Sequence, residues 1–248
     1  MTAQVEWGHV HNLLLDGDRL LLGTHEGLWQ QAPGEPPALL SQPPFDVMGL
    51  ASDGELLLAS GHPGPGQELP ADLGLLRSRD GQQWEQVSLQ GQVDFHRLAA
   101  TGPVVVGLSA HDGALLRSED SGASWKNLGT PPLYDVAIDP TDPDRLLGTT
   151  AQGVVASTDG GATFTGQDTA PLLALLAWTG ATVYGVAPDG VVHTSTDAGS
   201  SWQQVGQTGG PPEAFTADGS RLAVLVTGTL LESTDAGGTF APRLVLNQ

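Results

Sequence analysis

The chain has 248 residues and no cysteine, and its 9 lysine plus arginine residues against 28 aspartate plus glutamate residues give a formal net charge of -19 at pH 7. The lack of cysteine excludes disulfides, thiolate metal sites and cysteine nucleophiles. The acidity argues against nucleic acid or an anionic membrane surface as a partner. No segment has the length of a membrane span or the pattern of a signal peptide, so we expect a cytoplasmic protein unless a leader was removed.

The first elements in the chain are short apolar strands separated by turn residues. Residues 13–15 lead to Asp16-Gly17, and residues 19–22 lead to Gly23-Thr24. The same order of two strands and two turns recurs along the whole chain, and no segment shows a long apolar stripe with a period of 3.6 residues. This pattern predicts an all-β protein.

An octet with the form Ser-x-Asp-x-Gly-x-x-aromatic follows the third strand of most units. It occurs as Ser118-Glu119-Asp120-Ser121-Gly122-Ala123-Ser124-Trp125, and looser copies surround Asp80, Asp159, Asp197 and Asp235. In each copy the Asp is expected to bond turn amides and the Gly to take a positive φ, which makes a self-capped hairpin. The copy at Asp80 is one residue shorter, so we expect a tighter turn there.

The hairpin aspartates are 38 to 40 residues apart, which is the length of one four-stranded propeller blade. One more unit before the first hairpin, without its Ser and Asp, brings the count to six. We therefore predict a six-bladed β-propeller in a single domain over residues 1–248. Its blades are expected at about 8–43, 44–90, 91–130, 131–168, 169–208 and 209–246. The last blade carries its own outer strand, so the sequence leaves open how the ring closes.

The predicted blades place six of the seven histidines on one face of the ring. His9, His11 and His96 precede or begin innermost strands, whereas His25, His62 and His111 fall between second and third strands. In a propeller these two kinds of segment share one face, opposite the hairpins. Aligning the blades on the turn after the first strand then gives equivalent positions at the channel mouth, occupied by His11, Met48, His96, Tyr134, Ala174 and Glu213.

Neighbouring imidazole and thioether groups at one channel mouth predict a transition-metal site. We expect His11, Met48 and His96 to bind the metal with help from His9, His25 and His62. Imidazole with thioether favours copper, and a three-histidine zinc site is the next choice. Asp46, Asp94 and Glu26 are expected to orient the imidazoles from outside. Arg97 adjoins this set, but strand alternation points it away from the side that His96 uses.

The octets resemble the Asp-box, or bacterial neuraminidase repeat. The run from Ser60 to Ser78, with His9-Val10-His11, Thr24-His25, Met48-Gly49 and Asp94-Phe95-His96, resembles a bacterial family of Asp-box propellers often labelled sialidase-like or glycosyl hydrolase. The resemblance implies a propeller and does not by itself imply an activity. A histidine is common in that family where Glu26 stands here.

Two alternatives to metal binding remain open. A sialidase-like glycoside hydrolase or glycan-binding protein would use the same channel mouth, and hydrolysis needs two apposed carboxylates, for which Glu26 and Glu68 are the candidates. The arginine triad and paired tyrosine of sialidases are missing from the positions that would form such a site. The other alternative is a scaffold for protein partners, as many propellers are. We favour a non-enzymatic metal-binding propeller.

Overall fold

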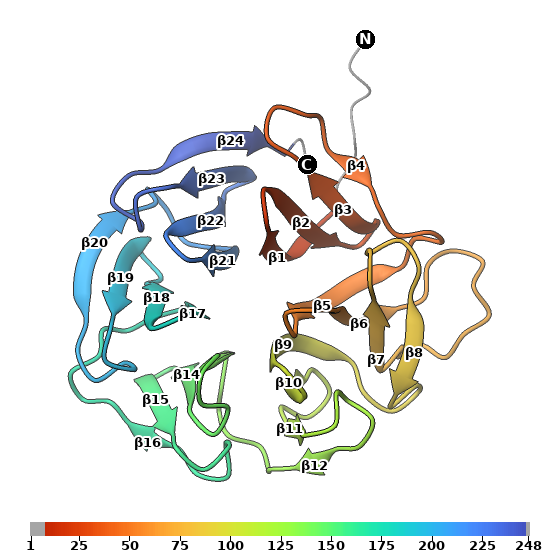
Figure 1. Cartoon of the computed structure of the whole chain (residues 1–248), viewed down its shortest axis with the longest axis horizontal. Helices are drawn as coiled ribbons and strands as arrows, with labels where there is room; N and C mark the ends of the chain where they lie inside the picture. Colours follow the sequence, from red (N-terminus) through yellow and green to blue (C-terminus); the bar gives the residue numbers. More distant parts are fainter. Residues whose placement is uncertain (1–7, 247–248) are drawn as a thin grey trace.

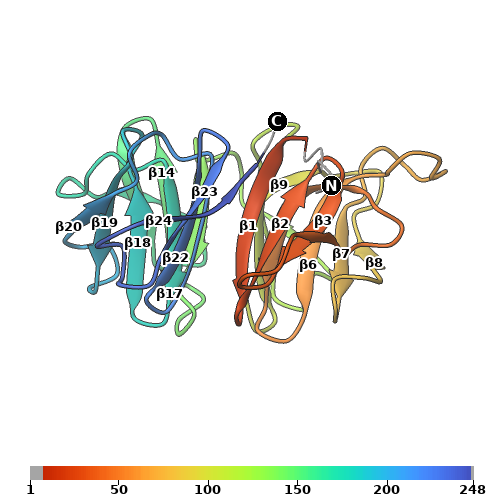
Figure 2. The ribbon, with the colours of Figure 1, turned by 90° about the horizontal axis from the view of Figure 1, so that it is seen from above.

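The computed structural model describes residues 8–246 and shows a ring of six four-stranded antiparallel sheets around a central channel (Figures 1 and 2). The prediction of an all-β, six-bladed propeller is confirmed. Each sheet consists of four strands that are consecutive in the chain, and the first strand of each lies innermost. The described residues contain no helix that is long and apolar enough to cross a membrane.

The blades are built from short strands that run outward from the channel. Blades 1 to 3 consist of β1 (Val10–Asp16), β2 (Arg19–Thr24), β3 (Gly27–Gln31) and β4 (Ala38–Leu39); β5 (Asp46–Ser52), β6 (Leu57–His62), β7 (Leu75–Ser78) and β8 (Glu85–Ser88); and β9 (Phe95–Thr101), β10 (Val104–Ser109), β11 (Leu115–Ser118) and β12 (Lys126–Asn127). Blades 4 to 6 consist of β13 (Asp135–Ile138), β14 (Leu146–Thr150), β15 (Gly153–Ser157) and β16 (Thr165–Gly166); β17 (Leu175–Thr179), β18 (Thr182–Val186), β19 (Val191–Ser195) and β20 (Gln203–Gln207); and β21 (Ala214–Asp218), β22 (Arg221–Val226), β23 (Thr229–Ser233) and β24 (Ala241–Val245).

The apolar core lies between neighbouring blades. The second strands read as continuous apolar runs because a neighbouring blade covers each face of the sheet, so side chains that point to either face are buried. In β2, for example, Leu20, Leu21 and Leu22 are all fully buried. Leu20 and Leu22 pack against blade 6, whereas Leu21 packs against blade 2.

The ring closes by side-to-side packing of blade 6 on blade 1. Among the described residues β24 pairs only with β23, and β1 pairs only with β2, so no strand is exchanged across the seam. Arg243 crosses it and donates from Nη2 to the carbonyl oxygen of Gln31 at 2.9 Å. Leu246 joins the apolar cluster formed by β1, β2 and blade 6. Within residues 8–246 the ring is therefore closed by packing and side-chain hydrogen bonds, without an exchanged strand; residues 2–7, which could add to the last blade, lie outside the described part of the chain.

The hairpins between third and fourth strands have the predicted bonds. Ser118 Oγ donates to Asp120 Oδ1 at 2.8 Å and accepts from the Gly122 amide at 2.8 Å, while Asp120 Oδ1 accepts from the Ser124 amide at 2.8 Å. Gly122 has a φ of 84°. The shorter copy at Asp80 turns one residue earlier, since Ser78 Oγ accepts from the third amide along the chain instead of the fourth. The hairpins therefore stabilise the blades at the edge away from the histidines.

Candidate functional site

Three β-bulges mark the start of the innermost strands in blades 1 to 3. The pairing of β1 with β2 skips His11, that of β5 with β6 skips Met48, and that of β9 with β10 skips His96. The innermost strands of blades 4 to 6 pair without such a shift. A bulge re-aims the side chain of the extra residue and is common next to functional sites. The three principal ligand candidates are thus the three bulge residues.

The bulge in β1 brings His11 to two groups from neighbouring elements. His25, in the turn after β2, places Nδ1 3.3 Å from His11 Nε2. Asp46, the first residue of β5 in the next blade, places Oδ2 2.9 Å from His25 Nδ1 and Oδ1 3.6 Å from His11 Nε2. These three side chains form a group of potential metal donors, one atom from each, within 4.8 Å of one another. We call this group the His-Asp triad.

The environment of His11 keeps its imidazole neutral. Burial is the largest cause, and repulsion from His25, His9, His96 and Arg97 adds to it, so that the pKa of His11 is lowered to about 3. A neutral imidazole has one ring nitrogen with a free lone pair, which is the form that binds a metal ion. His11 is therefore ready to act as a ligand over the whole neutral and mildly acidic range.

One carboxylate oxygen of Asp46 lies near His11 and makes no hydrogen bond to the described residues. Its Oδ1 is buried and makes no hydrogen bond in the described part of the chain, whereas Oδ2 contacts His25. A buried carboxylate oxygen without a partner is costly, so this atom is suited to accept a bond from a water molecule or an ion. Oδ1 is also the atom of Asp46 that lies close to His11 Nε2.

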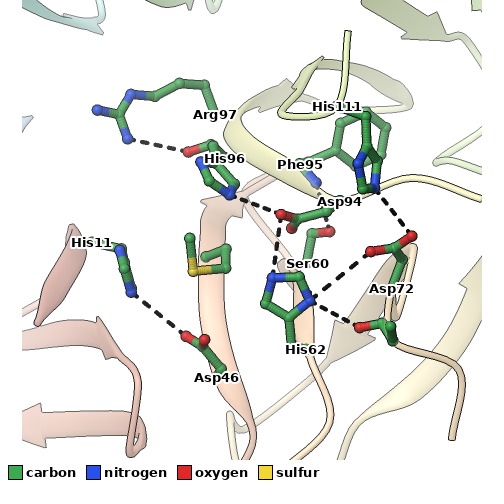
Figure 3. A network of polar contacts seen from close by, with 12 residues as sticks. His11, Asp46, Ser60, His62, Asp72, Asp94, Phe95, His96, Arg97 and His111 are labelled. Atoms are coloured by element: carbon green, nitrogen blue, oxygen red, sulfur yellow. Dashed lines mark hydrogen bonds and ion pairs between the residues drawn. The ribbon is translucent and has the colours of Figure 1, made fainter. Parts of the chain in front are cut away.

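His62 and His96 belong to a second network, built around Asp94 (Figure 3). Asp94 Oδ2 lies 2.8 Å from His96 Nε2 and 3.4 Å from His62 Nε2, and the Asp94 side chain is only 3% exposed. His62 Nδ1 donates to the carbonyl oxygen of Ala71 at 2.9 Å. Both ring nitrogens of His62 therefore face acceptors, which makes it a positioning residue for the 63–74 loop. His96 keeps Nδ1 free of hydrogen bonds to the described residues.

The other candidates take different positions around the triad. The His9 ring lies 4.8 Å from that of His11 and 6.1 Å from that of His25, so His9 borders the triad. Met48 is buried, with 8% of its surface exposed. Glu26 and Glu68, the candidates for hydrolysis, are both exposed, and neither lines the channel cavity.

The positions of two residues add to what the sequence predicts. Asp46 was expected to orient an imidazole, and its Oδ2 contacts His25 Nδ1 while its Oδ1 also lies 3.6 Å from His11 Nε2. The signal for it was the equal spacing of Asp46 before Met48 and Asp94 before His96. Arg97 was expected to point away from the side that His96 uses. It lines the channel cavity together with His11, whereas His96 does not line that cavity and contacts Asp94.

Comparison with known proteins finds no matching family model and no matching curated protein. Solved structures do match. The chain is 15% identical to a chain of a nidogen/laminin complex, with a TM-score of 0.68 and 90% of each chain covered. It is 19% identical to the GH74 xyloglucanase from Xanthomonas campestris, with a TM-score of 0.63, 97% of this chain and 46% of that chain covered. A third match is YCF48 bound to D1 peptide, at 14% identity, a TM-score of 0.53, and 96% and 75% coverage. The TM-scores support a shared propeller fold. Sequence identities this low support no shared activity.

Proposed function

We propose that this propeller binds a transition metal ion at the mouth of its channel, through His11 Nε2, His25 Nδ1 and the carboxylate of Asp46, and that it is not an enzyme. The observation that carries the proposal is the convergence of two imidazole nitrogens on a carboxylate whose buried Oδ1 has no hydrogen-bond partner among the described residues. The three donors come from two blades, so an ion at this position would also tie blade 1 to blade 2.

The separations of the donor atoms suit a small metal ion. Zinc binds imidazole nitrogen and carboxylate oxygen at about 2.0–2.2 Å, so two donors at a tetrahedral ion are about 3.3–3.6 Å apart. The His11 to His25 separation is 3.3 Å and the His11 to Asp46 separation is 3.6 Å. The shorter 2.9 Å between His25 and Asp46 is a hydrogen bond that a metal ion would replace. Only small shifts of side chains are then needed.

Residues around the triad would complete the site. His96 has Nδ1 available, and Asp94 fixes its ring by accepting from Nε2, which is the usual role of a carboxylate behind a metal-binding histidine. His9 borders the triad. Met48 is the bulge residue of β5, the innermost strand between those of His11 and His96. We propose His96, His9 and Met48 as additional or alternative ligands, and His62 as a residue that helps to position Asp94.

The donor set favours copper and then zinc. Divalent copper binds nitrogen and oxygen sites more tightly than the other first-row divalent ions, and a thioether from Met48 would extend the preference to Cu(I). Two imidazoles and one carboxylate are also a common zinc set that leaves a fourth position open. The carboxylate makes divalent ions better candidates than the imidazole and thioether set alone would suggest.

Titration of the purified chain with Cu(II) and Zn(II) in competition with a chelator tests the proposal. We expect one tightly bound ion per chain, and a loss of affinity of about 100-fold or more in His11→Ala and in Asp46→Asn, because each removes one of three ligands. His111→Ala is the matched control, since this exposed histidine lies on the same face but contacts Asp72 and not the triad. No stoichiometric ion, or equal losses in the control, would contradict the proposal.

The alternatives have less support. The enzyme among the structural matches shares only its fold with this chain, and Glu26 and Glu68 lie outside the channel cavity. For a protein scaffold, exposed Tyr134 and Leu172 precede innermost strands and so lie on the same face as the histidines. Membership of the Asp-box propeller family stays a proposal, supported by the bonds of the five hairpins.

A further inference from the structure

The central channel contains a small cavity next to the His-Asp triad. Its volume is about 200 Å³, and the innermost strands of all six blades line it. Most lining residues are apolar, and the charged or titratable ones are His11, Arg97 and Asp135. Arg97 is therefore the one permanent cation among the lining residues of this acidic protein.

Arg97 has hydrogen-bond donors that the described residues do not satisfy. Nη1 donates to the carbonyl oxygen of His96 at 3.1 Å. Nε is buried without a hydrogen bond, although Asp135 Oδ1 lies 3.4 Å away, and Nη2 has no hydrogen-bond partner within residues 8–246. A guanidinium group offers five N–H donors in a planar fork that matches a carboxylate or a phosphate. Nε has only the 3.4 Å ion pair with Asp135, so the guanidinium keeps donors that a further acceptor could use.

Asp135 holds Arg97 at this position. Asp135 is buried and accepts from the Leu176 amide through Oδ2 at 2.8 Å, so that Oδ1 faces Arg97. Asp135 offsets the charge of the partly exposed Arg97, and the nearby Asp46 and Asp94 add negative charge at the channel mouth. An anion is therefore repelled from the metal-free site. A bound divalent cation offsets the charge of these two carboxylates and adds a centre that an anion can coordinate, so the same cavity becomes favourable to an anion.

We propose that the channel cavity binds a small carboxylate anion, which contacts both the metal ion at the His-Asp triad and the guanidinium group of Arg97. This inference rests on the proposed metal site. A carboxylate has two coplanar oxygens, one for the ion and one for the guanidinium fork, and the three ligands of the triad leave a fourth position at a tetrahedral ion for the first of them. The cavity is smaller than the 300–1,000 Å³ or so that is typical of larger organic ligands, so the ligand has only a few heavy atoms.

The test uses fluoroacetate as the probe and follows its ¹⁹F resonance during titration with the full chain. Zinc-loaded protein is expected to bind the probe with saturation, and chelator-treated protein is expected not to bind it. Arg97→Gln should weaken binding about 10- to 100-fold, the effect of losing a hydrogen bond to a charged group, while the zinc content of the variant stays unchanged. Arg145→Gln is the matched control, because Arg145 pairs with Asp142 and does not line the cavity.

Each contrary result has a distinct meaning. If zinc binds but fluoroacetate binds Arg97→Gln as well as it binds the unchanged chain, the carboxylate site is wrong and the metal site stands. If inorganic phosphate displaces the probe at a lower concentration than acetate does, the assigned ligand class is wrong. If neither zinc nor copper binds, the metal proposal is wrong, and this inference is wrong with it.

Discussion

At the scale of single residues, the hairpin aspartates are held as carboxylates by their hydrogen bonds. The hydroxyl and the amide of Ser124, and then the hydroxyl of Ser118, lower the pKa of Asp120 to about 2. Hydrogen bonds of the same kind lower the pKa of Asp159, Asp197 and Asp235 to about 2 as well. The ordinary pKa of an aspartate is 3.8, so between about pH 2 and pH 4 the unfolded chain binds more protons than the folded chain.

We predict that the stability of the propeller is retained above about pH 4 and falls steeply as the pH decreases toward 2. A carboxyl group whose pKa is lowered by folding stabilises the fold at pH values above its pKa in the unfolded chain. That stabilisation is lost as the pH falls and the carboxylates take up protons. Urea midpoints at pH 7, 4 and 2.5 measure this effect. Asp120→Asn should lower the midpoint at pH 7 and flatten its decline with pH. A decline as steep as that of the unchanged chain would show that Asp120 does not contribute to it.

The residues of the site were only partly predictable. Counting along the repeats assigned the histidines to one face, because the loop in which each falls follows from the period. Which nitrogen meets which carboxylate depends on side-chain directions that the period does not record. His62 was grouped with the ligands, yet its nitrogens face Ala71 and Asp94. Asp46 was placed behind the ligands, yet it contacts His11 and His25 directly.

At the scale of elements, the pairing of β5 with β6 sets the position of Asp46 and Met48. Gly61 in β6 has a φ of 152°, and a Cβ atom there would lie 1.8 Å from the carbonyl oxygen of Asp46 and 3.0 Å from the amide nitrogen of Met48. Only glycine lets the two backbones approach this closely at the bulge. The glycine in β6 therefore shapes the strand that carries the carboxylate of the triad.

We predict that Gly61→Ala destabilises the fold by about 3 kcal/mol and also weakens metal binding, because the start of β5 must move away. Gly113→Ala is the control, since Gly113 also has a positive φ, of 71°, but its Cβ would meet nothing within 4 Å. It should cost only about 1 kcal/mol and leave metal affinity unchanged. Chemical denaturation and metal titration of both variants test this. Unchanged metal affinity in Gly61→Ala would contradict the assigned role.

The elements themselves were predictable because each boundary has its own turn chemistry. Asp-Gly turns, Gly-Thr turns and the Ser-Asp hairpins recur every 38 to 40 residues, and they delimit the strands without any tertiary information. The bulges at His11, Met48 and His96 were not predictable. A bulge adds one residue to one strand, and irregular loop lengths hide that addition in the sequence.

At the scale of the whole molecule, the ring is symmetric in its fold and asymmetric in its chemistry. All six blades have the same four strands, whereas bulges at the channel mouth and clustered histidines occur only in blades 1 to 3 within the described residues. Blades 4 to 6 contribute Asp135, Thr216 and apolar residues to the channel. The repeat therefore supplies a rigid frame, and one half of that frame carries the proposed site.

The most direct test of this account is an anomalous-scattering map from crystals of the full chain soaked with zinc or copper. We predict one strong peak at the channel mouth, about 2.0–2.2 Å from His11 Nε2, His25 Nδ1 and a carboxylate oxygen of Asp46. The ion should be absent from the same position in crystals of Asp46→Asn. A map with no peak there at saturating metal, or with the ion bound away from the triad, would contradict the central claim.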